Sequence, residues 1–66
     1  MTKLREYRIS RGLRQLDIAL TLSVNPNTIA AIERGQLAAP KRLIDPLCAF
    51  FGVQRGDLFT DNRIAL

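Results

Sequence analysis

The sequence contains no histidine and a single cysteine, Cys48. Zinc and iron sites in proteins are built mainly from these two residue types, so we expect no metal site of the usual kind. One cysteine cannot form a disulfide within the chain, and nothing in this content suggests secretion. The four glycines form no glycine-rich run that could hold a nucleotide phosphate. We therefore expect no cofactor and predict that the protein is not an enzyme.

Long hydrophobic runs are also missing. No apolar stretch approaches the ~20 residues that a membrane helix needs, and the charged start MTKLREYR lacks the apolar segment of a signal peptide. We therefore expect a cytoplasmic protein that does not associate with membranes. The 66 residues, 47% of them hydrophobic, suffice for one small domain. The chain shows no β-branched alternation, no repeat and no low-complexity linker.

Acidic residues are fewer than basic ones, with six Asp and Glu against ten Lys and Arg and a formal net charge of +4. Every basic residue except Lys3 and Lys41 is an arginine, whose planar group makes forked contacts to phosphate and guanine. The acids are interleaved with the bases, which excludes a disordered basic arm. This balance favours a nucleic acid as the partner.

Glycine and proline divide the chain into short helical segments. Asn25-Pro26 and Asp45-Pro46 each combine a preferred N-cap with a residue suited to the first position of a helix. Three glycines follow periodic stretches, where a helix commonly ends: Gly12, Gly35 and Gly52. The sequence thus predicts an all-α bundle of five short helices. They are expected at residues 2–11 with Thr2 as N-cap, from 14 or 15 to 22, and at 26–34, 46–51 and 55–59, with an irregular turn at 41–44.

The segment from Gln15 to Gly35 has the layout of a helix-turn-helix, with two short helices joined by a three-residue turn. Ala19 is small where the second helix must approach, and Val24 is an apolar residue placed to fill the corner. Ile29 and Ile32 would anchor the second helix to the core. The side chains left facing outward would belong to a recognition helix that enters the major groove: Asn27, Thr28, Ala31 and Arg34.

The same segment, QLDIALTLSVNPNTIAAIERG, resembles the helix-turn-helix of the phage-repressor and Cro-type regulators, the XRE or lambda-repressor-like family. The likeness extends from Leu4 to Phe59. Its most specific parts are Gln15, Ala19, the run Ile29-x-x-Ile32-Glu33-Arg34-Gly35, and Phe51-Gly52-Val53. The resemblance implies a sequence-specific regulator of transcription, typically a repressor, that binds double-stranded DNA.

The resemblance also implies roles for individual residues. Gln15 matches a position that touches phosphate and braces the recognition helix, and Asn25 and Asn27 match positions that meet the DNA backbone or base edges. Arg8 and Glu33 match a structural ion pair, although a solvated charge at a helix end is the alternative for Glu33. Ala31 matches a base-facing position, and Arg34, Lys41 and Arg42 match positions that bind phosphates. The expected DNA-binding residues are therefore Gln15, Asn25, Asn27, Thr28, Ala31, Arg34, Lys41 and Arg42.

The sequence departs from the family in the turn and on the recognition helix. Ser23 stands where glycine is usual, at a position that requires a positive φ and costs another residue on the order of 1 kcal/mol. Pro26, Ala30 and Ala31 carry no side-chain hydrogen-bonding group. Asn27 can pair with adenine and an alanine methyl can pack on thymine, so direct reading depends on few side chains. We expect DNA shape to supply the remaining specificity.

The same interpretation predicts a surface for dimer formation. A single small module makes few DNA contacts, so we expect a homodimer on a palindromic operator with half-sites ~34 Å apart. Residues 1–60 are expected to form the domain, and residues 61–66 a tail that is either frayed or part of the dimer contact. The candidate dimer residues are Phe59, Ile64 and Leu66, with Phe50 as a second candidate.

Leu16 and Leu20 lie four residues apart on the second predicted helix, where relatives usually carry polar residues. They are either an ordinary half-buried rim or a patch that contacts another protein. Together with the alanine-rich recognition helix, the patch supports a rival hypothesis, a protein-interaction module of the antitoxin or antirepressor type on the same scaffold. Gln15 and the basic loop at Lys41 and Arg42 favour DNA instead.

Overall fold

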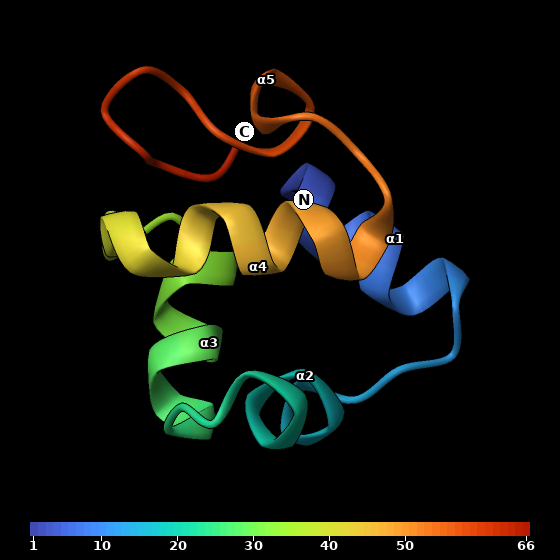
Figure 1. The fold of residues 1–66 in the computed structure, drawn as a ribbon. Helices are drawn as coiled ribbons and strands as arrows, with labels where there is room; N and C mark the ends of the chain where they lie inside the picture. The colour runs from blue at the N-terminus through green and yellow to red at the C-terminus, as the bar shows by residue number, and fades with distance from the viewer.

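The computed structural model describes all 66 residues and confirms an all-helical domain. Its five helices are α1 (Lys3–Ser10), α2 (Gln15–Leu22), α3 (Pro26–Glu33), α4 (Lys41–Phe51) and α5 (Arg55–Leu58). In Figure 1, α4 crosses the middle of the molecule, with α2 and α3 on one side and α5 and the C-terminal segment on the other. None of the helices is long and apolar enough to cross a membrane.

The start of α1, the end of α2 and the start of α3 follow from local capping chemistry. Asn25 is the N-cap of α3, where its Oδ1 accepts a hydrogen bond from the backbone N–H of Asn27 at 2.8 Å, and Pro26 occupies the first helical position. Thr2 caps α1 in the same way, through a bond from the Arg5 N–H at 3.3 Å. Ser23 ends α2 with a φ of 57°, the left-handed conformation expected there. The turn between α2 and α3 therefore closes without a glycine.

The fourth helix begins at Lys41, so the predicted start at Pro46 and the irregular turn at 41–44 were wrong. A proline inside a helix removes one hydrogen bond and costs roughly 3 kcal/mol. The buried side chains of α4 nevertheless form one continuous face that includes Leu43 and Ile44. Burying two such side chains contributes about 1.5–3 kcal/mol each, which offsets the cost of Pro46.

The core is one cluster of 14 buried residues, with α4 supplying Leu43, Ile44, Leu47, Cys48 and Phe51. Every helix contributes to this cluster. Arg11 holds the end of α4 against α1, because its guanidinium donates to the Phe51 carbonyl at 2.7 Å and lies 5.2 Å from the centroid of the Phe51 ring. Helix α3 is thereby carried on a core to which every helix contributes.

Residues 61–66 fold back onto the domain, which differs from the frayed end that was one alternative for them. Phe59 and Ala65 form an antiparallel bridge, and the Leu66 N–H donates to the Leu58 carbonyl at 2.9 Å. Arg63 bonds to both backbone groups of Ala39: its carbonyl accepts at 2.8 Å and its Nε donates at 3.0 Å. The C-terminal segment is thus tied to the loop between α3 and α4.

This return of the chain changes the candidate dimer surface. Phe59 is only 3% exposed and belongs to the core, so its assignment to an exposed contact was wrong. Its side chain is covered because the segment that follows pairs with it through Ala65. Ile64 is half-buried and Leu66 is exposed, which leaves these two available for a contact.

Candidate nucleic-acid interface

One face of α3 is anchored in the core and the opposite face is open. Ile29 and Ile32 have no exposed surface, as their spacing predicted. Asn27, near the N-terminal end of the helix, is exposed, whereas Thr28 and Ala31 are half-buried. The open face therefore offers one amide, one hydroxyl and one methyl group.

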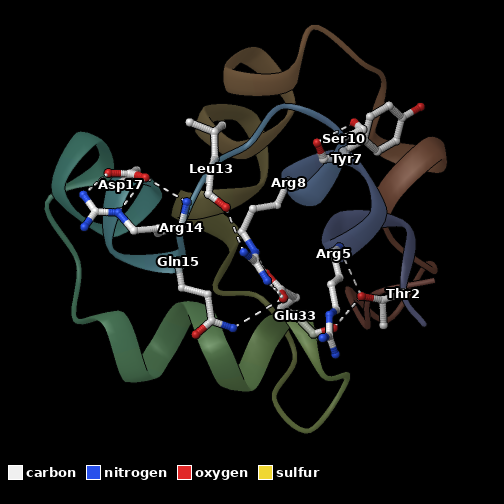
Figure 2. A network of polar contacts seen from close by, with 10 residues as sticks. All are labelled: Thr2, Arg5, Tyr7, Arg8, Ser10, Leu13, Arg14, Gln15, Asp17 and Glu33. Atoms are coloured by element: carbon white, nitrogen blue, oxygen red, sulfur yellow. Dashed lines mark hydrogen bonds and ion pairs between the residues drawn. The ribbon is translucent and has the colours of Figure 1, made fainter.

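A buried carboxylate ties the C-terminal end of α3 to α1 (Figure 2). Glu33 is only 2% exposed, and its two oxygens accept from Arg8 Nε at 2.8 Å and from a terminal Arg8 nitrogen at 2.9 Å. The third nitrogen of Arg8 donates to the Leu13 carbonyl at 2.8 Å. The expected ion pair is therefore present, in the bidentate geometry that makes such contacts strong. The alternative of a solvated charge at Glu33 is excluded.

The same carboxylate also receives a contact from α2. Gln15, the first residue of α2, is half-buried and its Nε2 donates to Glu33 Oε1 at 3.3 Å. Thr2 Oγ1 donates to the backbone carbonyl of Glu33. The hydrogen bonds to Glu33 raise the pKa of the Arg8 guanidinium above its already high ordinary value, although burial opposes this. The network fixes α3 relative to both α1 and α2.

Arg14 and Asp17 form a second ion pair at the start of α2, which sequence reasoning missed. Asp17 accepts from the Arg14 guanidinium at 2.9 Å and from the Arg14 backbone N–H at 2.7 Å. Hydrogen bonding to Arg14 lowers the pKa of the half-buried Asp17 carboxyl. The i, i+3 spacing of an acid and a base at a helix start was the signal that could have revealed it.

Three cations lie around the connection between α3 and α4. Arg34 caps the end of α3 and is exposed, with its Nε donating to Gln36 Oε1 at 3.1 Å. Lys41 and Arg42 form the exposed first turn of α4. None of the three is in an ion pair within the protein. Their positive charge is therefore available to an external anion.

Four more of the residues singled out from the sequence have different environments: Leu16, Leu20, Phe50 and Asn25. Leu20 is 69% exposed and Leu16 is 42% exposed, both on α2. Phe50 is half-buried, with its ring edge-on to Phe51 at a centroid distance of 4.9 Å. Asn25 is exposed, but its side-chain oxygen is engaged in capping α3. Its contact with DNA would therefore rely on the amide nitrogen.

Sequence reasoning also missed Arg5. Arg5, Arg8 and Arg34 line an open hollow with Arg14, and Gln15 and Glu33 complete its wall. Arg5 precedes Arg8 by three residues, so the two lie near each other on α1. That spacing was visible in the sequence, but only the structure places the hollow next to the end of α3.

Comparisons with known proteins agree with this geometry. Residues 2–59 match the helix-turn-helix domain family. An uncharacterised helix-turn-helix-type transcriptional regulator of Methanocaldococcus jannaschii is 40% identical over 57 residues, which cover 86% of each chain. The transcriptional repressor RstR of the cryptic phage CTXphi, from Vibrio cholerae, is 31% identical over 62 residues, 94% of this chain and 56% of the repressor. No solved structure gives a significant match.

Proposed function

The chain belongs to the helix-turn-helix family of DNA-binding transcriptional regulators, which are not enzymes, and from this premise we propose that it is a repressor that recognises a specific operator through α3. The observation that carries the proposal is the α3 face itself. The helix is anchored by Ile29 and Ile32, and its end is fixed by the buried Glu33 network. A helix held by the core on one face and open on the other, beside uncompensated cations, suits the major groove.

Base reading is assigned mainly to Asn27. Its amide is exposed near the N-terminal end of α3, where recognition helices contact base edges, and it can form two hydrogen bonds with adenine. Thr28 and Ala31 would add a hydroxyl contact and a packing contact with a thymine methyl. Because these groups are few, part of the specificity would come from the shape of the DNA.

Phosphate binding is assigned to the residues around the two ends of α3. Asn25 would contact the DNA backbone at the N-terminal end of α3. Gln15, whose amide bonds to Glu33, would do so at the C-terminal end, on the side of Arg34, Lys41 and Arg42. The three cations have no carboxylate partner in the protein, so phosphates would replace water and counterions around them. Such contacts position the protein on DNA and are insensitive to sequence.

We further propose a homodimer that binds a palindromic operator. Two copies of α3 about 34 Å apart would enter successive major grooves on one side of the duplex. Ile64 and Leu66 are the candidate contact, since Phe59 is enclosed in the core, and Phe50 is the second candidate. Action on the chromosome would place the protein in the cytoplasm.

One comparison of two variants tests the division between reading and positioning. Asn27→Ala should weaken binding to the cognate site by about 1–3 kcal/mol and leave random-duplex binding nearly unchanged. Lys41→Ala should weaken both and make the salt dependence shallower by about one unit. Fluorescence anisotropy titrations at several KCl concentrations measure all four affinities.

The rival function, a protein-interaction module, is supported by a separate observation, the exposed pair Leu16 and Leu20 on α2. A protein-interaction module would use this pair to contact a partner and would have no need of the basic first turn of α4 at Lys41 and Arg42. Duplex binding that is absent, or indifferent to salt, would favour this rival. Equal losses at both DNA sites for Asn27→Ala would instead keep DNA binding and remove Asn27 as the reading residue.

A further inference from the structure

The side of the molecule that joins α1 to the end of α3 holds more positive charge than the proposed contacts use. The hollow between Arg14 and Arg34 continues into a second one that reaches Gln36 and Leu66. Three residues line both hollows: Arg5, Glu33 and Arg34. The two hollows therefore form one continuous surface, from the start of α2 to the start of α1.

Arg5 is the unengaged cation of this surface. Its side chain makes no hydrogen bond or ion pair, whereas Arg8 is bonded to Glu33 and Arg14 to Asp17. Figure 2 shows the Arg5 side chain extending from α1 past Thr2 to the vicinity of Glu33. Arg34, on the other side of the hollow, contacts only the neutral amide of Gln36. Two uncompensated guanidinium groups thus flank one open hollow.

The charge of the hollow is positive in spite of Glu33. Arg8 binds the Glu33 carboxylate with two nitrogens, and Gln15 adds a third donor to it. The carboxylate is almost fully buried, so it presents little negative charge to an approaching anion. The exposed cations of the hollow that have no carboxylate partner are Arg5 and Arg34.

We propose that Arg5 and Arg34 together bind phosphates of the DNA backbone, so that α1 takes a direct part in DNA binding. Glu33 and Arg34 are the last residue and the C-cap of α3, which places the hollow at the end of the recognition helix. Backbone phosphates border the major groove on both sides of an inserted helix. The planar guanidinium group suits a phosphate with two hydrogen bonds. The inference rests on the proposed function, since it presumes that α3 enters the groove.

The neighbouring Lys3 provides a matched control on the same helix. At about 100° per residue, Lys3 projects on nearly the opposite side of α1 from Arg5. It faces Glu6, with 3.7 Å between Nζ and Oε2, and lines a different hollow with Tyr7 and Ser10. Lys3→Ala and Arg5→Ala each remove one positive charge from α1, but Lys3 lies outside the hollow and beside an acid, whereas Arg5 lines the hollow without a partner.

The experiment measures the affinity of the full chain for a random-sequence duplex against KCl concentration. Arg5→Ala should make the slope of log affinity against log salt shallower by about one unit, because about 0.9 counterion is released per phosphate. Lys3→Ala should keep the wild-type slope, and Arg5→Lys should retain most of it. Thermal melting should be nearly the same for all variants, since the exposed Arg5 side chain has no partner to lose and an exposed pair such as Lys3 and Glu6 contributes little to stability.

Two outcomes would overturn the inference, and they are distinguishable. Equal slopes for Arg5→Ala and Lys3→Ala, with salt-dependent binding by the wild type, would remove α1 from the interface and leave the proposed function standing. No salt-dependent binding by the wild-type protein would overturn the inference and the proposed function together.

Discussion

At the scale of single residues, Glu33 is the residue whose side chain joins the most helices through hydrogen bonds. It is the only charged residue whose side chain is buried, and it accepts from side chains of both α1 and α2. Burial of a charge is tolerated only when the charge is paired and hydrogen-bonded, and both conditions are met here. No buried side-chain nitrogen or oxygen in the protein lacks a partner. The network therefore stabilises the position of α3 and not only the domain.

Removal of this carboxylate should be severe. Glu33→Ala leaves the Arg8 guanidinium without its partner in a partly buried site, which typically costs ~3–5 kcal/mol. A domain with about 5–15 kcal/mol of total stability would then be close to unfolding. Urea unfolding followed by circular dichroism measures the change.

Asp61→Ala is the control for that experiment, because Asp61 is exposed and forms no ion pair. Its midpoint should stay near that of the wild type. A Glu33→Ala protein that unfolds at the same urea concentration as the control would show that the pair does not hold the fold.

At the scale of helices and turns, local chemistry predicted most boundaries. The caps at Thr2 and Asn25 and the left-handed turn at Ser23 lie where their residue types indicated. The start of α4 could not be predicted in this way. Asp45-Pro46 is a strong local signal for a helix start, but burial of Leu43 and Ile44 extends the helix through the proline. Tertiary packing decided a boundary that local propensity alone placed wrongly.

The turn between α2 and α3 offers a stabilising substitution. Ser23 is exposed, has a φ of 57° and makes no side-chain hydrogen bond, so its side chain contributes strain and no contact. Ser23→Gly should remove that strain and stabilise the protein by about 0.5–1 kcal/mol after the entropy cost of glycine. In a domain of this size that corresponds to a rise in Tm of roughly 2–8 °C.

Ser23→Ala separates backbone strain from loss of the hydroxyl group. Alanine keeps the steric penalty of a Cβ at positive φ, so its Tm should not rise. A Ser23→Gly protein that melts at or below the wild-type temperature would show that the left-handed conformation is not the costly feature of this turn.

At the scale of the whole molecule, the N-terminal and C-terminal segments are hydrogen-bonded to each other. The Lys3 N–H donates to the Leu66 carbonyl, and Ala65 is buried beside the end of α5. The sequence could not predict this closure, because the residues concerned are far apart in the chain and carry no turn motif. It withdraws Phe59 from any protein contact and leaves Ile64 and Leu66 as the accessible apolar residues of the C-terminal segment.

The candidate interface was predictable as a set of residues but not as a surface. Gln15, Asn27, Arg34 and Lys41 could be chosen from their places in the motif, since helical spacing separates buried from exposed positions. The proposed role of Arg5 depends on how α1 packs across the end of α3, which is a long-range property. Sequence reasoning therefore placed α3 and its exposed residues correctly and missed the basic hollow next to it.

The central claim is that the exposed face of α3 reads a DNA sequence, and selection of binding sites from a random duplex library tests it most directly. We expect the purified protein to enrich an inverted repeat whose half-sites are centred about 10 base pairs apart. The enriched site should bind at least ~10³-fold more tightly than random duplex at the same salt concentration. Recovery of no common sequence after repeated rounds, with all duplexes bound equally, would contradict the claim.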